Sequence, residues 1–472
     1  MPPTRWHPRL SRGAGPVYRA IADALEADIR SGRLTAGDAL PTQRDLAERL
    51  GVNFTTVTRA YAEARRRGLL AARVGSGTFV AGPNAAAVLG ALVTPAPESS
   101  GDVDLSVNAP PMPAWMGGAL RAAIERAGAD ADVARQMLSY RTRQGDAAAR
   151  AAGAAWLRAR GLDVDTERVA VTAGAQHALA LLFGTLARPG DAVLVESLCY
   201  PGLEGPAAAA GVRLVGVPVD GEGLRPDALD AACRRQNAKV LCCVPTLQNP
   251  TTAVMSLERR RAVLDVARRR GLRVLEDDIC GPLLQGEATP LAALAPDLVT
   301  YVGSLSKCVA PGLRTAFVLT TSRDDAARLD AAVRASVLML SPLPLAVASA
   351  WVADGTAARA AADIGREAAA RGALARRVLG ASNVAAPPGS LHAWLDVPPS
   401  WSVAAFVAGA QQRGIRVTPA DWFVRPDGAG RTPPPNAVRL ALGGVADRAT
   451  LERALETLAG ILAQPARRAA TL

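Results

Sequence analysis

Residues 302–314 read VGSLSKCVAPGLR and place one lysine, Lys307, among serines, glycines and small apolar side chains. Lys307 and Lys239 are the only two lysines among the 54 basic residues of the chain. An amine can lose its proton and attack a carbonyl carbon, whereas a guanidinium effectively cannot. A surface lysine on a loop is the plain alternative, but an amine kept in so arginine-rich a chain favours a chemical role.

Short apolar runs typical of buried strands lie on both sides of Lys307 and alternate with Ala- and Arg-rich helical stretches. They start at residues 169, 192, 212, 239, 273, 298 and 314. Alternating strands and helices indicate a mostly parallel sheet with helices on both faces, and such sheets bind ligands at the carboxyl ends of their strands. The sequence therefore predicts an α/β domain from about residue 101 onward.

Polar or aromatic residues follow five of these runs, at the predicted carboxyl edge of the sheet. They are Gly174, Ala175 and Gln176 after the first run, and then Tyr200, Asn249, Asp277 and Lys307. The Gly174 turn opens an apolar helix, where backbone N–H groups suit a phosphate. Each residue alone also fits an ordinary turn, cap or loop, but together and in this order they predict a cofactor pocket.

The first 80 residues have the pattern of a DNA-binding head. They hold 13 Arg and 7 Asp and Glu, and their net charge of +6 is more than half of the +11 of the whole chain. Helical patterns cover residues 18–32 and residues 42–50, where Thr42 is the cap. A third helical stretch follows the cap Asn53. Two strand-like runs within residues 68–80 (GLLAARVGSGTFV) follow. This order predicts a winged helix-turn-helix whose third helix enters the major groove.

The stretch LPTQRDLAERLGVNFTTVTRAYAEARRRGLLAARVGSGTFV, residues 40–80, resembles the winged head of GntR-type bacterial regulators. The resemblance implies DNA contacts from Arg44, Asn53, Thr55, Thr56, Arg59 and Gly77. One position departs from the pattern, because Phe54 stands where relatives often carry Arg directly after the helix cap. A purely structural three-helix module is the alternative for this segment.

The ordered series of strand-end residues resembles the fold type I pyridoxal phosphate enzymes of the class I and II aminotransferase group, over roughly residues 105–460. The resemblance implies that Lys307 binds the cofactor as an aldimine and that Asp277 pairs with the ring nitrogen. It also implies that Asn249 contacts the ring hydroxyl and the substrate, and that Tyr200 stacks on the ring.

The same resemblance assigns the phosphate and the substrate carboxylate. It implies a phosphate cradle made of the turn at Gly174, Ala175 and Gln176 together with Ser304, Ser306 and Arg314. Tyr140 in YRTRQG matches a tyrosine that reaches the phosphate from a partner subunit, and Arg439 in NAVRLALGG matches the arginine that binds the α-carboxylate of an amino acid.

Two departures from the aminotransferase pattern reduce the expected catalytic competence. Cys280 occupies the place of a tyrosine that usually donates to the ring hydroxyl, and a thiol is a weak donor. Ala173 and Ala175 stand where relatives carry Ser or Thr around the phosphate turn. Cofactor binding survives such changes more easily than fast transamination does.

Head and body together resemble the MocR-type regulators, with an N-terminal winged helix-turn-helix (α+β) at residues 1–80, a linker at 81–100 and an α/β fold type I aminotransferase-like domain at 101–472. The resemblance implies a homodimeric regulator that binds double-stranded DNA, holds pyridoxal 5'-phosphate on Lys307 and senses the cofactor, an amine or an amino acid. A metabolic aminotransferase with an autoregulatory head is one alternative, and a DNA-binding protein whose body no longer binds cofactor is another.

The remaining composition bears on compartment and metals. The six cysteines show no CxxC spacing and the three histidines are far apart, so we expect no metal site and free thiols in a reducing cytoplasm. No run approaches the roughly 18 apolar residues of a membrane span, so we expect no membrane association. The effector, the operator sequence and the sign of regulation do not follow from the sequence.

Overall fold

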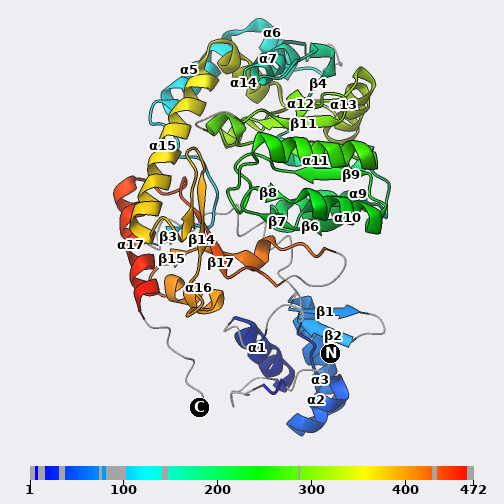
Figure 1. The fold of residues 1–472 in the computed structure, drawn as a ribbon, viewed down its shortest axis with the longest axis vertical. Coiled ribbons are helices and arrows are strands. Elements are labelled where there is room, and N and C mark those ends of the chain that lie inside the picture. The colour runs from blue at the N-terminus through cyan, green and yellow to red at the C-terminus, as the bar shows by residue number, and fades with distance from the viewer. Residues whose placement is uncertain are drawn as a thin grey trace.

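The computed structural model describes residues 6–8, 16–30, 34, 38–67, 69–73, 77–80, 102–140, 147–284, 288–427 and 433–464 (Figure 1). The whole predicted linker, residues 81–100, lies outside these ranges, and the proposed domain limits therefore stay predictions.

The head has the predicted helices and hairpin. Its elements are α1 (Val17–Arg30), α2 (Gln43–Leu50), α3 (Phe54–Arg66), β1 (Leu70–Arg73) and β2 (Gly77–Val80). Thr42 caps α2 by accepting a hydrogen bond from the Asp45 N–H, and Asn53 caps α3 by accepting one from the Thr55 N–H. The apolar faces of the three helices enclose one small core, which includes Leu46, Val57 and Tyr61.

The body is built on a seven-stranded sheet. Its order is β4 (Val169–Thr172), β12 (Ala316–Leu319), β11 (Val299–Ser304), β10 (Arg273–Asp277), β9 (Val240–Cys243), β5 (Ala192–Glu196) and β6 (Arg213–Val217). All seven predicted runs form these strands. The strand β12 runs antiparallel to both of its neighbours, β11 and β4. The connection of residues 305–315 is too short for a parallel crossover, which needs a dozen or more residues.

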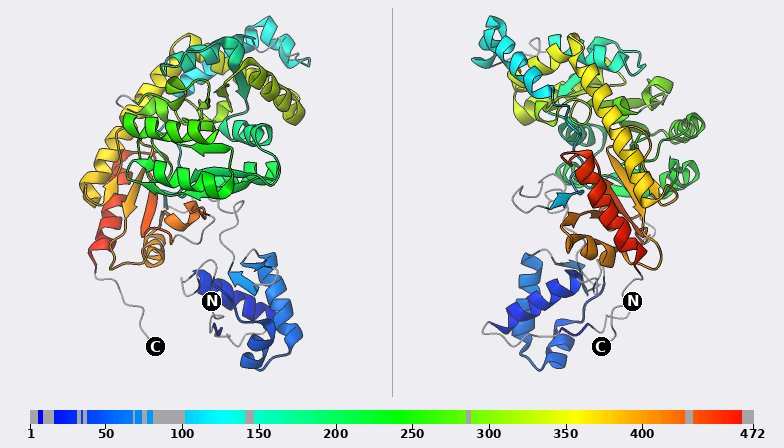
Figure 2. Two further views of the ribbon diagram at one scale, coloured as in Figure 1. Left: turned by 45° about the vertical axis from the view of Figure 1, so that its right-hand side comes forward. Right: turned by 90° about the vertical axis from the view of Figure 1, so that its left-hand side faces the viewer.

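Successive side chains of the large sheet enter two different cores, which explains why its strands are apolar throughout. In β4, Val169 and Val171 belong to one core cluster and Ala170 to another. The helices that cover the two faces (Figure 2) include α7 (Ala147–Arg158), α8 (Ala175–Leu186), α9 (Glu204–Ala210), α10 (Pro226–Gln236), α11 (Leu257–Arg270), α13 (Arg323–Val337) and α14 (Pro342–Ala353). The prediction of an α/β domain with helices on both faces is therefore confirmed.

A second, smaller layer faces the carboxyl edge of the large sheet. It holds an antiparallel sheet of β13 (Val384–Ala385), β14 (His392–Asp396), β17 (Ala437–Ala441) and β16 (Thr418–Pro419). The long helix α15 (Thr356–Leu379) packs beside α17 (Arg448–Ala463) and extends toward the large sheet (Figure 1). The first described strand of the body, β3 (Val103–Asp104), pairs with β15 (Ile415–Arg416) in this layer.

The remaining elements complete the described chain. They are α5 (Met116–Ala129), α6 (Ala131–Met137), β7 (Val219–Asp220), β8 (Gly223–Leu224), α12 (Leu291–Leu294) and α16 (Val403–Gln411), with single 3-10 turns at Thr166–Arg168, Pro201–Leu203, Gly281–Leu283, Pro311–Leu313 and Ala420–Phe423. Within the residues that the structure describes, no helix combines the length and the apolar character that crossing a membrane requires.

We predict that Tyr61→Phe loosens the head. The buried Tyr61 hydroxyl donates to the Pro41 carbonyl at 2.8 Å, which fixes α3 to the segment before α2. Losing this bond costs about 1 kcal/mol, so the buried amides of α3 should exchange hydrogen roughly fivefold faster. Tyr18→Phe is the control, because the Tyr18 hydroxyl makes only an exposed bond with Arg19. Equal exchange rates in the two variants would contradict the assignment.

Candidate functional site

Lys307 lies just beyond the end of β11, in the short connection to β12. Its ammonium group donates to the backbone carbonyl of Asn108, which belongs to the segment after β3. Burial lowers the pKa of Lys307, and the positive charges of Arg439 and Arg314 lower it further. The site therefore makes the Lys307 proton easier to lose than in water, and the neutral amine is the form that can act as a nucleophile.

Asp277 ends the neighbouring strand β10 and is 6% exposed. Burial, together with the adjacent carboxylate of Asp278, raises its pKa to about 7. Its Oδ1 atom is buried and accepts no hydrogen bond from any residue within the described ranges. A buried carboxylate oxygen without a donor is costly, so the geometry suits a ligand that brings an N–H group.

The turn at Gly174 meets Arg314 across the strand pair β4 and β12. Gly174 caps α8 with a φ of 86°, and a side chain at this position would collide with the Arg314 guanidinium. Arg314 donates to the Ala173 carbonyl at 3.1 Å and lies 3.4 Å from the Ser306 hydroxyl. The first N–H groups of α8 and a guanidinium therefore converge, which is an arrangement that suits a phosphate.

Two details of this turn did not follow from the sequence. The Ala173 N–H donates to Nδ1 of His177 at 3.1 Å, so this backbone group is already used inside the protein. The Ser304 hydroxyl accepts from the Ser306 N–H at 3.2 Å, so these two serines are bonded to each other. The groups that could bind a phosphate are therefore Arg314, the Ser306 hydroxyl and the N–H groups at the start of α8.

Tyr200 and Gln176 meet over the same edge of the sheet. The Tyr200 ring lies so close to Gly202 that a side chain there would overlap it. Burial raises the pKa of Tyr200, and so does the nearby Asp277 carboxylate. Gln176 donates to the Gly202 carbonyl at 2.6 Å, and its side chain therefore supports the Tyr200 segment. Ala175 is the first residue of α8 and contributes its backbone N–H.

Arg439 in β17 faces this edge from the small sheet. The residue is 1% exposed, and its guanidinium donates to Asn249 Oδ1 at 2.9 Å and to the Ser106 carbonyl at 2.6 Å. Its Nε atom is buried without a partner among the described residues. Burial lowers the pKa of Arg439 to about 10, and a buried cation of this kind gains from an incoming carboxylate.

Asn108 and His392 also belong to the site, although no motif in the sequence predicted them. Asn108 Nδ2 lies 3.4 Å from His392 Nδ1, and His392 Nε2 lies 3.3 Å from the Gln248 carbonyl. Burial lowers the pKa of His392 to about 3, and Arg439 contributes, so the imidazole is neutral. The alternation of LHAWLD, which places His392 and Trp394 on one face of a strand, is the signal that could have found His392.

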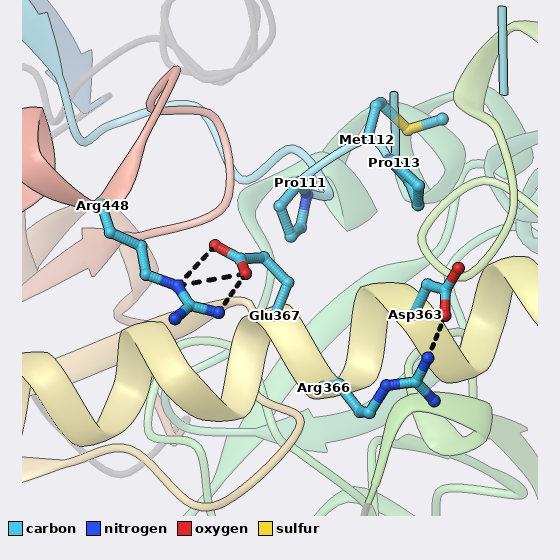
Figure 3. A pocket seen from close by; sticks show the side chains of 7 residues that line it. All are labelled: Pro111, Met112, Pro113, Asp363, Arg366, Glu367 and Arg448. Atoms are coloured by element: carbon cyan, nitrogen blue, oxygen red, sulfur yellow. Dashed lines mark hydrogen bonds and ion pairs between the residues drawn. The ribbon is translucent and has the colours of Figure 1, made fainter. Parts of the chain in front are cut away.

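The segment after Asn108 continues beside a pocket of about 500 Å³ (Figure 3). Its lining residues are Pro111, Met112, Pro113, Asp363, Arg366, Glu367 and Arg448. The charged side chains are paired with each other, because Arg448 binds Glu367 at 2.6 Å and Arg366 binds Asp363. This pocket therefore lacks a free charge to recognise a ligand within the residues drawn.

Tyr140 lies apart from the site residues described above. Tyr140 is 83% exposed and precedes residues 141–146, which lie outside the described ranges. Over the ranges that the structure covers, no three His, Cys, Asp or Glu side chains gather in a way that could hold a metal ion.

The proposed DNA contacts lie on the outer surface of the head. Arg44, Asn53, Thr55 and Arg59 are exposed, Thr56 is half-buried, and Gly77 begins β2. Asn53 Oδ1 accepts from both the N–H and the hydroxyl of Thr55, which leaves the Asn53 amide group for other partners. The Arg59 guanidinium lies 5.0 Å from the centre of the Tyr18 ring. Gly75 and Ser76 of the predicted wing fall outside the described residues.

We predict that Asp277→Asn stabilises the cofactor-free protein at high pH. The folded state holds the Asp277 proton up to a pKa of about 7, whereas the unfolded chain releases it near 3.8. Stability from this carboxyl is therefore lost as the pH rises from about 4 to 7. At pH 8 the variant should melt about 2–4 °C higher, and the difference should shrink at pH 5. Asp163→Asn, at an exposed position, should change neither value.

Several known proteins are similar to the chain. It is 29% identical over 461 residues to the HTH-type transcriptional regulator YdeF of Bacillus subtilis, covering 98% of this chain and 97% of the relative. It is also 29% identical to the HTH-type transcriptional regulator TauR of Rhodobacter capsulatus, over 70% of this chain and 72% of TauR. The crystal structure of the α-aminoadipate aminotransferase LysN of Thermus thermophilus superposes with a TM-score of 0.68, at 24% identity, over 85% of this chain and 98% of LysN.

Two families match the chain, and together they account for both of its parts. Residues 17–80 match the bacterial regulatory proteins of the gntR family, and residues 100–458 match the aminotransferases of class I and II. The second match implies pyridoxal 5'-phosphate as the cofactor, in agreement with the Asp277 Oδ1 atom that is unpaired among the described residues and with the turn at Gly174. The chain belongs to the class I and II aminotransferase family and carries a gntR-family DNA-binding head, the combination of the MocR-type regulators.

Proposed function

We propose that the chain is a transcription regulator whose body holds pyridoxal phosphate at Lys307 and responds there to an amino acid or a related amine. One observation carries the proposal. A lysine of lowered pKa and a buried carboxylate with one oxygen unpaired among the described residues follow neighbouring strands, in a chain whose first residues form a winged helix-turn-helix. An enzyme needs only the first feature, whereas a ligand-responsive regulator needs both.

Each residue of the site has a part in holding the cofactor. Asp277 would accept from the ring nitrogen, Tyr200 would cover the ring, and Asn249 would contact the ring hydroxyl. Arg314, Ser304, Ser306 and the start of α8 would bind the phosphate. When bound, pyridoxal phosphate supplies an aldehyde for an amine and a ring that withdraws electrons. Lys307 contributes an amine whose proton is easily lost.

Arg439 supports an amino acid as the ligand in preference to a simple amine. Its guanidinium is directed to Asn249 and to the Ser106 carbonyl, which are neutral acceptors. A carboxylate gives an arginine a shorter and stronger bond than a neutral carbonyl does. A ligand carboxylate would therefore exchange with the Ser106 carbonyl.

Cys280 supports a sensor over an efficient aminotransferase. It is 8% exposed, close enough to Lys307 to interact electrostatically, and burial raises its thiol pKa to about 12. A neutral thiol is a weak hydrogen-bond donor, so it cannot replace a tyrosine hydroxyl beside the ring. We therefore expect at most slow transamination. Sustained conversion of an amino acid in the presence of a 2-oxo acid would instead favour the aminotransferase alternative.

A homodimer accounts for the exposed apolar residues around α5, α6 and the end of α13. Leu138 is 88% exposed, Tyr140 83% and Leu338 60%, values that are unusual for large apolar side chains of a monomer. A partner subunit at this surface would bury them and would bring Tyr140 to the partner's phosphate. The six cysteines are all free and buried, which supports a reducing compartment such as the cytoplasm.

The test compares the two lysines of the chain. We expect the full-length protein to show a visible absorbance band with pyridoxal phosphate, Lys239→Ala to keep it, and Lys307→Ala to lose it. Lys239 is exposed, so it is a matched control for the loss of one amine. Lys307→Ala should still bind DNA, but its affinity should no longer respond to added amino acids. The absence of a band from the parent, or its survival in Lys307→Ala, would contradict the proposal.

We further predict that Gly174→Ala weakens cofactor binding at least tenfold. The new methyl group would collide with the Arg314 guanidinium, and the φ of 86° is unfavourable for alanine. Gly184→Ala in the same helix is the control, because a Cβ there meets no described atom within 4 Å. Titration of both variants by absorbance would measure the difference. Equal affinities would remove Gly174 and Arg314 from the phosphate site.

A further inference from the structure

The outer face of the recognition helix α3 carries a row of apolar groups. Phe54, Thr58 and Ala62 are exposed and lie four residues apart, so they share one side of the helix. Phe54 is 46% exposed although it is a large aromatic residue in the first turn. Phe54 therefore presents a large part of its ring to solvent at the start of the recognition helix.

The polar groups of this row are already engaged. The Thr58 hydroxyl lies 2.8 Å from Gln43 Oε1 and 3.0 Å from the Phe54 carbonyl. A hydroxyl has one hydrogen, so the Thr58 donor is used within the head and its methyl group is the part left for a partner. The row also contains no Asn, Gln, Arg or Lys, the side chains that read bases through paired hydrogen bonds.

The major groove offers one apolar feature, the C5-methyl group of thymine, and Ala, Thr and Phe are the side chains that contact it. We propose that Phe54 and Thr58 read thymine methyl groups, so that each half-site of the operator carries T·A pairs under the start of α3. This inference rests on the DNA-binding role of the head proposed above.

The spacing of the two side chains fixes the spacing of the two thymines. Four residues of α-helix rise about 6 Å along the axis, and neighbouring base pairs are separated by about 3.4 Å. Phe54 and Thr58 therefore face positions about two base pairs apart. Arg44 and Arg59 are exposed on the flanks and supply the charge that holds the helix at the phosphates.

The first step of the test finds a site for the full-length protein by selection from random-sequence duplexes. Binding to the selected duplex is then compared with a copy in which deoxyuridine replaces thymidine, because this change removes only the methyl group. We expect the copy to bind about fourfold more weakly for each methyl group that is contacted. Replacement at thymidines outside the two positions should have no effect.

Two variants then assign the methyl contact to Phe54. In Phe54→Ala the difference between thymidine and deoxyuridine should vanish at one position and persist at the other. Val17→Ala is the matched control, because Val17 in α1 is also 46% exposed but lies outside the recognition helix. It should keep the full discrimination. Far-ultraviolet circular dichroism of both variants verifies that the helices are intact.

The outcomes separate this inference from the proposed function. Selection of a site that the parent binds equally well with deoxyuridine would overturn the methyl contact and leave DNA binding intact. Full discrimination by Phe54→Ala would overturn the role of Phe54. Failure of the parent to select any sequence would contradict the DNA-binding role itself, and this inference with it.

Discussion

The short connection between β11 and β12 is the constraint on which the site depends. It returns the chain antiparallel, so β12 can pair with β4 in the register Ala316↔Thr172. Gly174 lies two residues after Thr172 and Arg314 two residues before Ala316, and this register brings them together. The same connection holds Lys307 at the end of β11. One turn thus positions a lysine, an arginine and a helix start.

The site keeps several buried polar atoms without partners, which is costly for the fold. Within the described residues these include Asp277 Oδ1, Asn108 Oδ1 and Arg439 Nε. An apolar side chain at each place would stabilise the body, because an unpaired buried polar atom costs about 1–3 kcal/mol. Their presence around one lysine is easiest to understand when a ligand supplies the missing bonds and adds its binding free energy to the stability of the body.

The local sequence was sufficient to predict those site residues that follow strands of the large sheet. Asp277 ends β10, Lys307 follows the neighbouring strand β11, and the positive φ of Gly174 favours a glycine. Ser106 and Asn108 could not be predicted in this way, because they follow β3 outside the large sheet. His392 comes from β14 of the small sheet, where only the alternation of its strand pointed to it. The reversed direction of β12 was predictable in principle from the length of residues 305–315, but strand patterns alone carry no direction. Tyr140 is exposed, and its proposed contact with a phosphate depends on the homodimer that we propose.

Two cations of the site are hydrogen-bonded to backbone carbonyls. The Ser106 carbonyl accepts from Arg439, and the Asn108 carbonyl accepts from Lys307. These carbonyls follow β3, the first described strand after residues 81–101, which connect the body to the head. A carboxylate at Arg439 must compete with the Ser106 carbonyl. The occupancy of the site and the anchoring of the chain near its junction with the head are therefore linked equilibria, and each shifts the other by the same free energy.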